Sequence, residues 1–200
     1  MPSYAALVLA GGAARRMGGA PKPLLPVGGV PLLSRVLAAL RDADPIVVVG
    51  PTELEPLLPP GVRRTREQPP GGGPVAAIAA GLALCPPTGR VAVVGADLPF
   101  LTAEALAELL AADAPAALYA DGQGRAQHLL AVWRTEALRA AVPPEPAGAS
   151  MRGLLRDIAP HLAAWTGTGP PPWYDCDTVP DLRAANDLTG AEGPDGRRPD

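Results

Sequence analysis

Two groups of residues, far apart in the sequence, are of types that together could hold a phosphate and a metal ion. The first is LVLAGGAARRMGGAPKPLL, residues 7–25, in which glycines and arginines lead to Lys22. Glycine lets backbone N–H groups approach a phosphate, and an ammonium group is a point charge for a phosphoryl oxygen. Lys22 is the only lysine among the 17 basic residues of the chain. The stretch therefore predicts an anion cradle suited to a polyphosphate.

The second group consists of aspartates. In VAVVGADLPFL, residues 91–101, Asp97 follows an apolar run. In YDCDTVPDL, residues 174–182, Asp175 and Asp177 alternate, so an extended backbone places both on one side. Carboxylates are ligands for Mg²⁺, which bridges nucleotide phosphates. The combination indicates a metal-assisted phosphate site.

Each piece also has a purely structural interpretation. The glycines could form a plain turn, Asp97 could cap the turn before Pro99, and the later aspartates could lie in a solvated turn. The glycines of EQPPGGGPVAAIAAGL, residues 67–82, could seat a flat nucleobase or form a loop. Lys22 is followed by Pro23 rather than Ser or Thr, so this is not a Walker A loop, and the GxGxxG spacing is also missing.

Apolar runs typical of buried strands alternate with helix-like stretches. Strands are expected at 5–10, 45–50, 90–95, 116–120 and 129–133, and helices at 31–40, 73–84, 150–158 and from a Thr102 cap onward. This alternation predicts an α/β fold with a mainly parallel sheet covered on both faces. Ligands bind beyond the carboxyl ends of such strands. Gly11, Gly12 and Asp97 are therefore expected at the same edge.

Length and charge exclude several classes of protein. Two hundred residues suit one domain over residues 1–188, and the polar segment 189–200 is expected to be a disordered tail. The net charge of −3 gives no reason to expect nucleic-acid or membrane binding, and there is no apolar run near 20 residues. We expect a soluble, cytoplasmic protein without a signal peptide. The two cysteines lie far apart without a CxxC pair, and there are only two histidines, so a thiolate metal site is not expected.

Four blocks, in this order, resemble nucleotidyltransferases related to the molybdenum cofactor guanylyltransferase. They are LAGGAARRMGGAPKPLL, GGGPVAAIAAGL, GADLPFL and DCDTVPDLRAAND, and the resemblance spans about residues 4–187. It implies a Rossmann-like, three-layer α/β/α fold of the nucleotide-diphospho-sugar-transferase type. It also implies transfer of GMP from Mg-GTP to the terminal phosphate of molybdopterin, with release of pyrophosphate. A transient handover of the pterin from cofactor-maturation or molybdoenzyme-maturation proteins is left open.

The resemblance assigns roles to particular residues. The implied nucleotide-binding residues are Leu9, Ala10, Gly11, Gly12, Arg15, Arg16, Gly18, Lys22, Gly72, Gly73 and Pro74. The implied catalytic residues are Lys22, Arg16 and Asp97, and the Mg²⁺ ligands are Asp97 and Asp177. On the acceptor side, the candidates are Arg125, Gln127, His128, Arg152 and Asp175.

The last block departs from the guanylyltransferase pattern. Asp175 and Asp177 stand where that family usually shows Asn-x-Asn-Thr-Pro, and Val179 replaces the proline. Related cytidylyl enzymes often carry aspartates there, whereas the LAGG stretch ending at Gly12 resembles the guanylyl branch. A cytidylyltransferase or a sugar-1-phosphate nucleotidyltransferase of the same fold is therefore the alternative. A non-catalytic nucleotide-binding module is the second alternative, since a fold does not guarantee activity.

Overall fold

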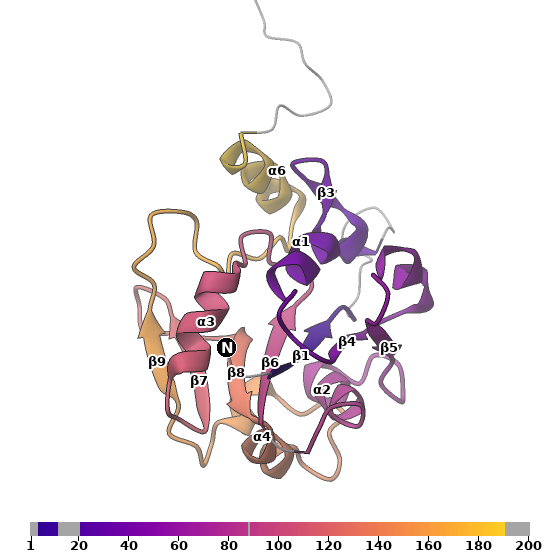
Figure 1. Ribbon diagram of the computed structural model, residues 1–200, viewed down its shortest axis with the longest axis vertical. Helices are drawn as coiled ribbons and strands as arrows, with labels where there is room; N and C mark the ends of the chain where they lie inside the picture. Colours follow the sequence, from indigo (N-terminus) through magenta and orange to yellow (C-terminus); the bar gives the residue numbers. More distant parts are fainter. Residues whose placement is uncertain (1–3, 12–20, 88, 191–200) are drawn as a thin grey trace, which may run out of the picture.

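A seven-stranded sheet forms the centre of the part of the chain that the computed structural model describes, residues 4–11, 21–87 and 89–190 (Figure 1). Its strands, in spatial order, are β5 (Arg63–Thr65), β4 (Ile46–Val49), β1 (Tyr4–Leu9), β6 (Arg90–Gly95), β8 (Ala126–Arg134), β7 (Ala116–Ala120) and β9 (His161–Ala164). Neighbouring strands are parallel, except that β8 is antiparallel to both β6 and β7. The mainly parallel sheet predicted from the sequence is confirmed.

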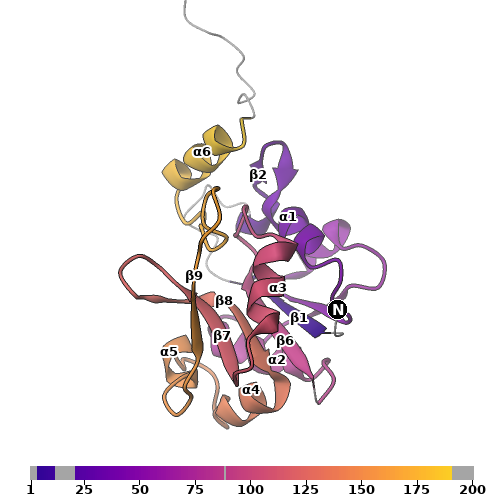
Figure 2. The ribbon, with the colours of Figure 1, turned by 60° about the vertical axis from the view of Figure 1, so that its left-hand side comes forward.

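Helices cover both faces of this sheet, which confirms the expected three-layer α/β/α arrangement (Figure 2). On one face lie α1 (Leu32–Ala39) and α3 (Ala103–Ala111), and on the other lie α2 (Pro74–Leu82), α4 (Thr135–Ala141) and α5 (Met151–Leu154). Along β1, Val8 enters the core on the side of α1, whereas its neighbour Leu7 enters the core on the side of α2. Burial on both faces explains why β1, β4 and β6 are apolar at nearly every position. No helix in the described ranges is both long and apolar enough to cross a membrane.

The last helix returns to a hairpin near the start of the chain. The elements involved are α6 (Val179–Leu188), β2 (Pro26–Val27) and β3 (Val30–Pro31), which lie side by side (Figure 1). The backbone N–H of Gly28 donates to Asn186 Oδ1 at 2.9 Å. This hydrogen bond holds α6, and with it the segment just before α6, against the β2–β3 hairpin.

Some elements differ from those that the sequence predicted. The expected strand at 129–133 is longer, since β8 begins at Ala126, and the helix expected over 150–158 ends at Leu154. The edge strands β5 and β9 were not predicted, because each has only three or four residues and lacks a buried apolar run. Trp133 of β8 is 1% exposed and lies in the core.

The predicted Thr102 cap of α3 is present, since Thr102 Oγ1 accepts a hydrogen bond from the Ala105 N–H at 3.2 Å. Replacing Thr102 by Ala should lower the free energy of unfolding by about 1 kcal/mol, because an N–H in the first helical turn loses its acceptor. Urea unfolding measures the change, and Thr102→Ser, which keeps the hydroxyl, serves as the control. Equal stability of T102A and wild type would show that this cap contributes nothing.

Candidate active site

The carboxyl ends of four neighbouring parallel strands meet at one edge of the sheet and surround a cavity of about 630 Å³, which we call the strand-end cavity. Gly11 lies beyond the end of β1, and Gly50 follows β4 directly. Glu67 lies two residues after β5, and Gly95 ends β6. Among the predicted nucleotide-binding residues, the lining includes Leu9, Gly11, Gly73 and Pro74. Open α/β sheets bind their ligands at this kind of edge.

Several residues that line the strand-end cavity are glycines, so parts of its wall consist of main chain without side chains. A Cβ added to Gly50 would lie 2.9 Å from Leu54 Cδ1 and 3.0 Å from Ala10 Cβ, so a larger residue does not fit there. Gly73, the N-cap of α2, has φ 90°, a left-handed conformation that favours glycine. A ligand can therefore approach the main chain directly at this cavity.

The ammonium group of Lys22 lies between two carboxylates. Lys22 Nζ donates to Asp97 Oδ2 at 2.5 Å and to Asp177 Oδ1 at 2.6 Å. Lys22 begins the short helix η2 (Lys22–Leu24), Asp97 follows β6, and Asp177 precedes α6. The side chains of Lys22 and Asp97 are 17% and 20% exposed, whereas that of Asp177 is 70% exposed. Residues separated by 75 and 155 positions in the sequence thus meet at one point.

Burial and charge have opposite effects on this lysine. Burial disfavours the ammonium and by itself lowers the pKa of Lys22, but the charge of Asp97 and the hydrogen bonds to Asp177 and Asp97 outweigh it and raise that pKa above its usual value. For Asp175, partial burial and the charges of Asp177 and Asp97 raise the pKa of the carboxyl group. The Lys22 ammonium thus contacts two carboxylates, and Asp175 lies close enough for its carboxyl group to respond to their charges.

A smaller cavity of about 260 Å³, which we call the aspartate cavity, adjoins the first. Its lining includes Gln127, His128, Trp173, Asp175 and Asp177. Asp97 and Leu129 line both cavities. Two compartments therefore share a wall that carries a carboxylate in contact with the lysine.

Two predicted acceptor residues lie away from this lining. Arg125 Nε donates to Asp121 Oδ2 at 2.7 Å near the turn between β7 and β8, outside the lining of the aspartate cavity. Arg152 lies in α5, also outside that lining. Partial burial, and then the charge of Arg152, lower the pKa of His128. The charge of Arg152 therefore acts on His128, which lines the aspartate cavity.

Four other predicted residues, Gly12, Arg15, Arg16 and Gly18, lie outside the described residues. Ala10 and Gly72 are buried next to residues that line the strand-end cavity and are not themselves part of its lining.

Glu67 is a cavity residue that the sequence did not reveal. It is only 6% exposed, and its Oε1 accepts a hydrogen bond from the Gly71 N–H at 2.9 Å. Within the described ranges, Oε2 has no hydrogen-bond partner, and a buried polar atom in that state is usually explained by a ligand or water. The only signal was a glutamate before a Pro- and Gly-rich stretch. Because β5 was not predicted, the sequence did not show that Glu67 lies just beyond the end of a strand.

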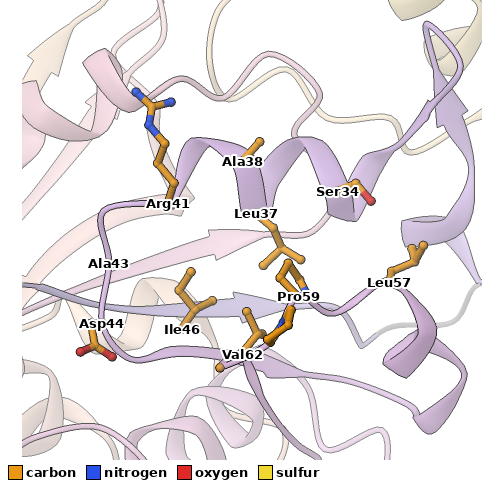
Figure 3. Close-up of a pocket in the computed structure, with 12 residues that line it drawn as sticks. Ser34, Leu37, Ala38, Arg41, Ala43, Asp44, Ile46, Leu57, Pro59 and Val62 are labelled. Carbon is orange, nitrogen blue, oxygen red and sulfur yellow. The ribbon is translucent and has the colours of Figure 1, made fainter.

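A third cavity, of about 510 Å³, lies beside α1 (Figure 3). Leu37, Ile46 and Val62 line it, and Ile46 stands at the amino end of β4. This cavity and the strand-end cavity therefore lie at opposite ends of β4. The cluster around Lys22 belongs to the strand-end and aspartate cavities, so the chemistry is assigned there.

The described residues contain no group of three or more His, Cys, Asp or Glu side chains placed to hold a metal ion. Asp97 and Asp177 nevertheless converge on one cation, the Lys22 ammonium. Mg²⁺ is usually bound by one or two carboxylates, with water and substrate phosphates as the other ligands. The donor set therefore fits a metal ion that arrives with phosphates better than a metal ion alone.

Comparisons of the sequence with known proteins give one consistent result. A family model described as MobA-like NTP transferase domain matches residues 6–191. The molybdenum cofactor guanylyltransferase of Rhodobacter capsulatus is 36% identical over 197 residues, which cover 95% of this chain and 98% of that protein. The protein of the same name from Bradyrhizobium sp. is 33% identical over 205 residues, covering 94% of each.

Solved structures share the fold. Molybdopterin-guanine dinucleotide biosynthesis protein A from Archaeoglobus fulgidus gives a TM-score of 0.70 at 22% identity, covering 93% of this chain and 98% of that one. The 2-C-methyl-D-erythritol 4-phosphate cytidylyltransferase from Thermus thermophilus gives 0.68 at 22% identity, covering 94% and 99%. At this identity the likeness shows the fold alone.

The lowered pKa of His128 predicts a pH effect on stability. The unfolded chain binds a proton at His128 more readily than the folded protein, so this residue makes stability fall as the pH drops through about 6.5. His128→Gln should therefore lose less stability than wild type between pH 7.5 and pH 5.5, by less than about 1 kcal/mol, because the group is only partly buried. Urea unfolding at both pH values measures this. His161→Gln, at an exposed position in β9, is the matched control, and an unchanged pH dependence in H128Q would contradict the assignment.

Proposed function

Because the chain belongs to the MobA-like NTP transferase domain family, we propose that it transfers GMP from GTP to the terminal phosphate of molybdopterin and releases pyrophosphate. The observation that carries this proposal is the shared wall at Asp97 and Leu129 between the strand-end and aspartate cavities. A transferase must hold two substrates side by side. Here the two compartments meet at the carboxylate that contacts Lys22.

In this reaction an oxygen of the acceptor phosphate forms a bond to the α-phosphorus of GTP, while the bond from the α-phosphorus to the bridging oxygen breaks. The electron pair of that bond leaves with pyrophosphate. Such a transfer depends mainly on alignment and on neutralising charge, so no side-chain nucleophile is required. Lys22 is proposed to hold a phosphoryl oxygen near the wall that the cavities share. Arg15 and Arg16, which precede Lys22 in the sequence, are proposed to add charge there.

Mg²⁺ is the proposed cofactor, and Asp97 and Asp177 are its proposed protein ligands. Their oxygens lie 2.5 Å and 2.6 Å from one cationic nitrogen, whereas Mg²⁺ holds its oxygen ligands at about 2.0–2.1 Å. Both carboxylates would be available to the ion once the Lys22 ammonium has moved to a phosphoryl oxygen. Bound there, the metal would neutralise charge on the nucleotide phosphates. We expect both substrates, and hence the reaction, to be cytoplasmic.

Glu67 supports GTP as the nucleotide. The guanine edge carries two adjacent donors, N1–H and the 2-amino group, and a carboxylate is an acceptor with two oxygens. Cytosine offers one donor next to an acceptor, which fits a carboxylate less well. The Oε2 atom of Glu67, buried in the strand-end cavity and without a partner among the described residues, is the acceptor that such an edge needs.

The proposed reaction is tested by pyrophosphate release with molybdopterin, Mg²⁺ and GTP, CTP or UTP in turn. GTP should be the preferred nucleotide. Lys22→Ala and Asp97→Ala should each abolish turnover while circular dichroism shows an intact fold, since both remove charge at the reacting phosphates. Release with CTP alone would indicate the cytidylyl alternative, and normal turnover in either variant would reject the assigned roles.

Glu67→Gln should weaken GTP binding about 10- to 100-fold, because one charge-assisted hydrogen bond is lost and an amide donor then faces a donor on guanine. Isothermal titration calorimetry with GTP and CTP measures this, and the affinity for CTP should fall much less. Glu55→Gln is the control, since Glu55 is an exposed acid paired with Arg64 and lies outside the lining of the strand-end cavity. An equal loss for both nucleotides in E67Q would show that Glu67 does not read the base.

A further inference from the structure

The lysine ammonium occupies the position at which the two carboxylates would hold a metal ion. Asp97 Oδ2 and Asp177 Oδ1 both contact Lys22 Nζ and therefore lie within about 5 Å of each other. We infer that Lys22 is the resident cation of this pair and keeps a divalent ion out until nucleotide phosphates arrive. This inference rests on the proposed function, because it concerns how that site admits its metal.

The local structure favours this occupancy. Lys22 is flanked by Pro21 and Pro23, whose rings restrict the backbone on both sides. The Asp97 carboxylate folds back over Gly95, where an added Cβ would lie 2.5 Å from Oδ1. Glycine at this position therefore lets the carboxylate take the orientation in which its other oxygen meets Lys22.

A free metal ion has two disadvantages at this site. It must displace an ammonium group that is already paired at 2.5 Å and 2.6 Å, and Mg²⁺ gives up its water ligands reluctantly. The described protein groups offer it two carboxylates and no third ligand of the His, Cys, Asp or Glu type in the same group. Binding of the metal alone is therefore weak.

Nucleotide phosphates remove both of these disadvantages. They supply the missing oxygen ligands for the metal, and they give the Lys22 ammonium another anionic partner. The carboxylates then take the metal while Lys22 moves to a phosphoryl oxygen. Metal and polyphosphate should accordingly strengthen each other's binding, because each stabilises the arrangement that the other needs.

The first test measures binding of Mn²⁺ alone by electron paramagnetic resonance. Wild type should bind it weakly, and Lys22→Met, which keeps most of the length of the side chain and removes the charge, should bind it at least about tenfold more tightly. The gain should vanish when Asp97→Asn is added. Arg134→Met is the control, because Arg134 pairs with Asp113 at 2.6 Å on another part of the molecule. Equal affinity of wild type and folded K22M, or a gain that survives D97N, would overturn the inference.

The second test uses the unaltered protein, so it does not depend on how K22M folds. Because Lys22 is the only lysine, selective ¹³C labelling of lysine gives a single ε-CH₂ resonance. Millimolar Mg²⁺ alone should leave this signal in place, whereas Mg²⁺ with inorganic tripolyphosphate should move it. A comparable shift with Mg²⁺ alone, or none with both, would contradict the exchange. Tripolyphosphate has no base and no turnover is measured, so these results are independent of whether GTP and molybdopterin are the substrates.

Discussion

The contact of one ammonium group with two carboxylates is the interaction around which the site is organised. Lys22, Asp97 and Asp177 belong to three distant segments, and their side chains meet at 2.5 Å and 2.6 Å. Partly buried charges are costly unless they are paired, so this pairing ties together η2, the end of β6 and the segment before α6. The packing of α6 beside the β2–β3 hairpin, with the hydrogen bond from Gly28 to Asn186, holds the third segment in place. The atoms that join these three segments are thus the ones to which the proposed function assigns the chemistry.

The parallel sheet explains why the strand-end cavity and the acidic residues lie at the same edge. Adjacent parallel strands end at the same edge, so the residues after β1, β4, β5 and β6 surround one cavity. β8 is antiparallel to β6, and so brings Leu129 to the same edge beside Asp97. This change of direction places a second cavity against the first. An arrangement of this kind lets a donor and an acceptor share a wall without a separate domain.

The sequence predicted the central sheet because β1, β4 and β6 are apolar at nearly every position, as burial on both faces requires. It also predicted that Gly11 and Asp97 lie at one edge, which follows from the chain direction of parallel strands. The sequence did not reveal Glu67, because the short edge strand before it carries no periodic signal. Nor could it show that Arg125 pairs with Asp121, since the turn that brings these two together is a matter of local geometry. Long-range contacts that depend on packing, such as that of Asp177 with Lys22, could be proposed only through the resemblance to a family.

The most direct test of the central claim is a crystal structure of the protein with GTP and Mn²⁺, in which anomalous scattering locates the metal. The account predicts a manganese peak about 2 Å from a carboxylate oxygen of Asp97, with the guanine in the strand-end cavity beside Glu67. It also predicts the triphosphate next to the Lys22 ammonium. Nucleotide bound instead in the cavity beside α1, or a metal ion remote from Asp97, would contradict the account.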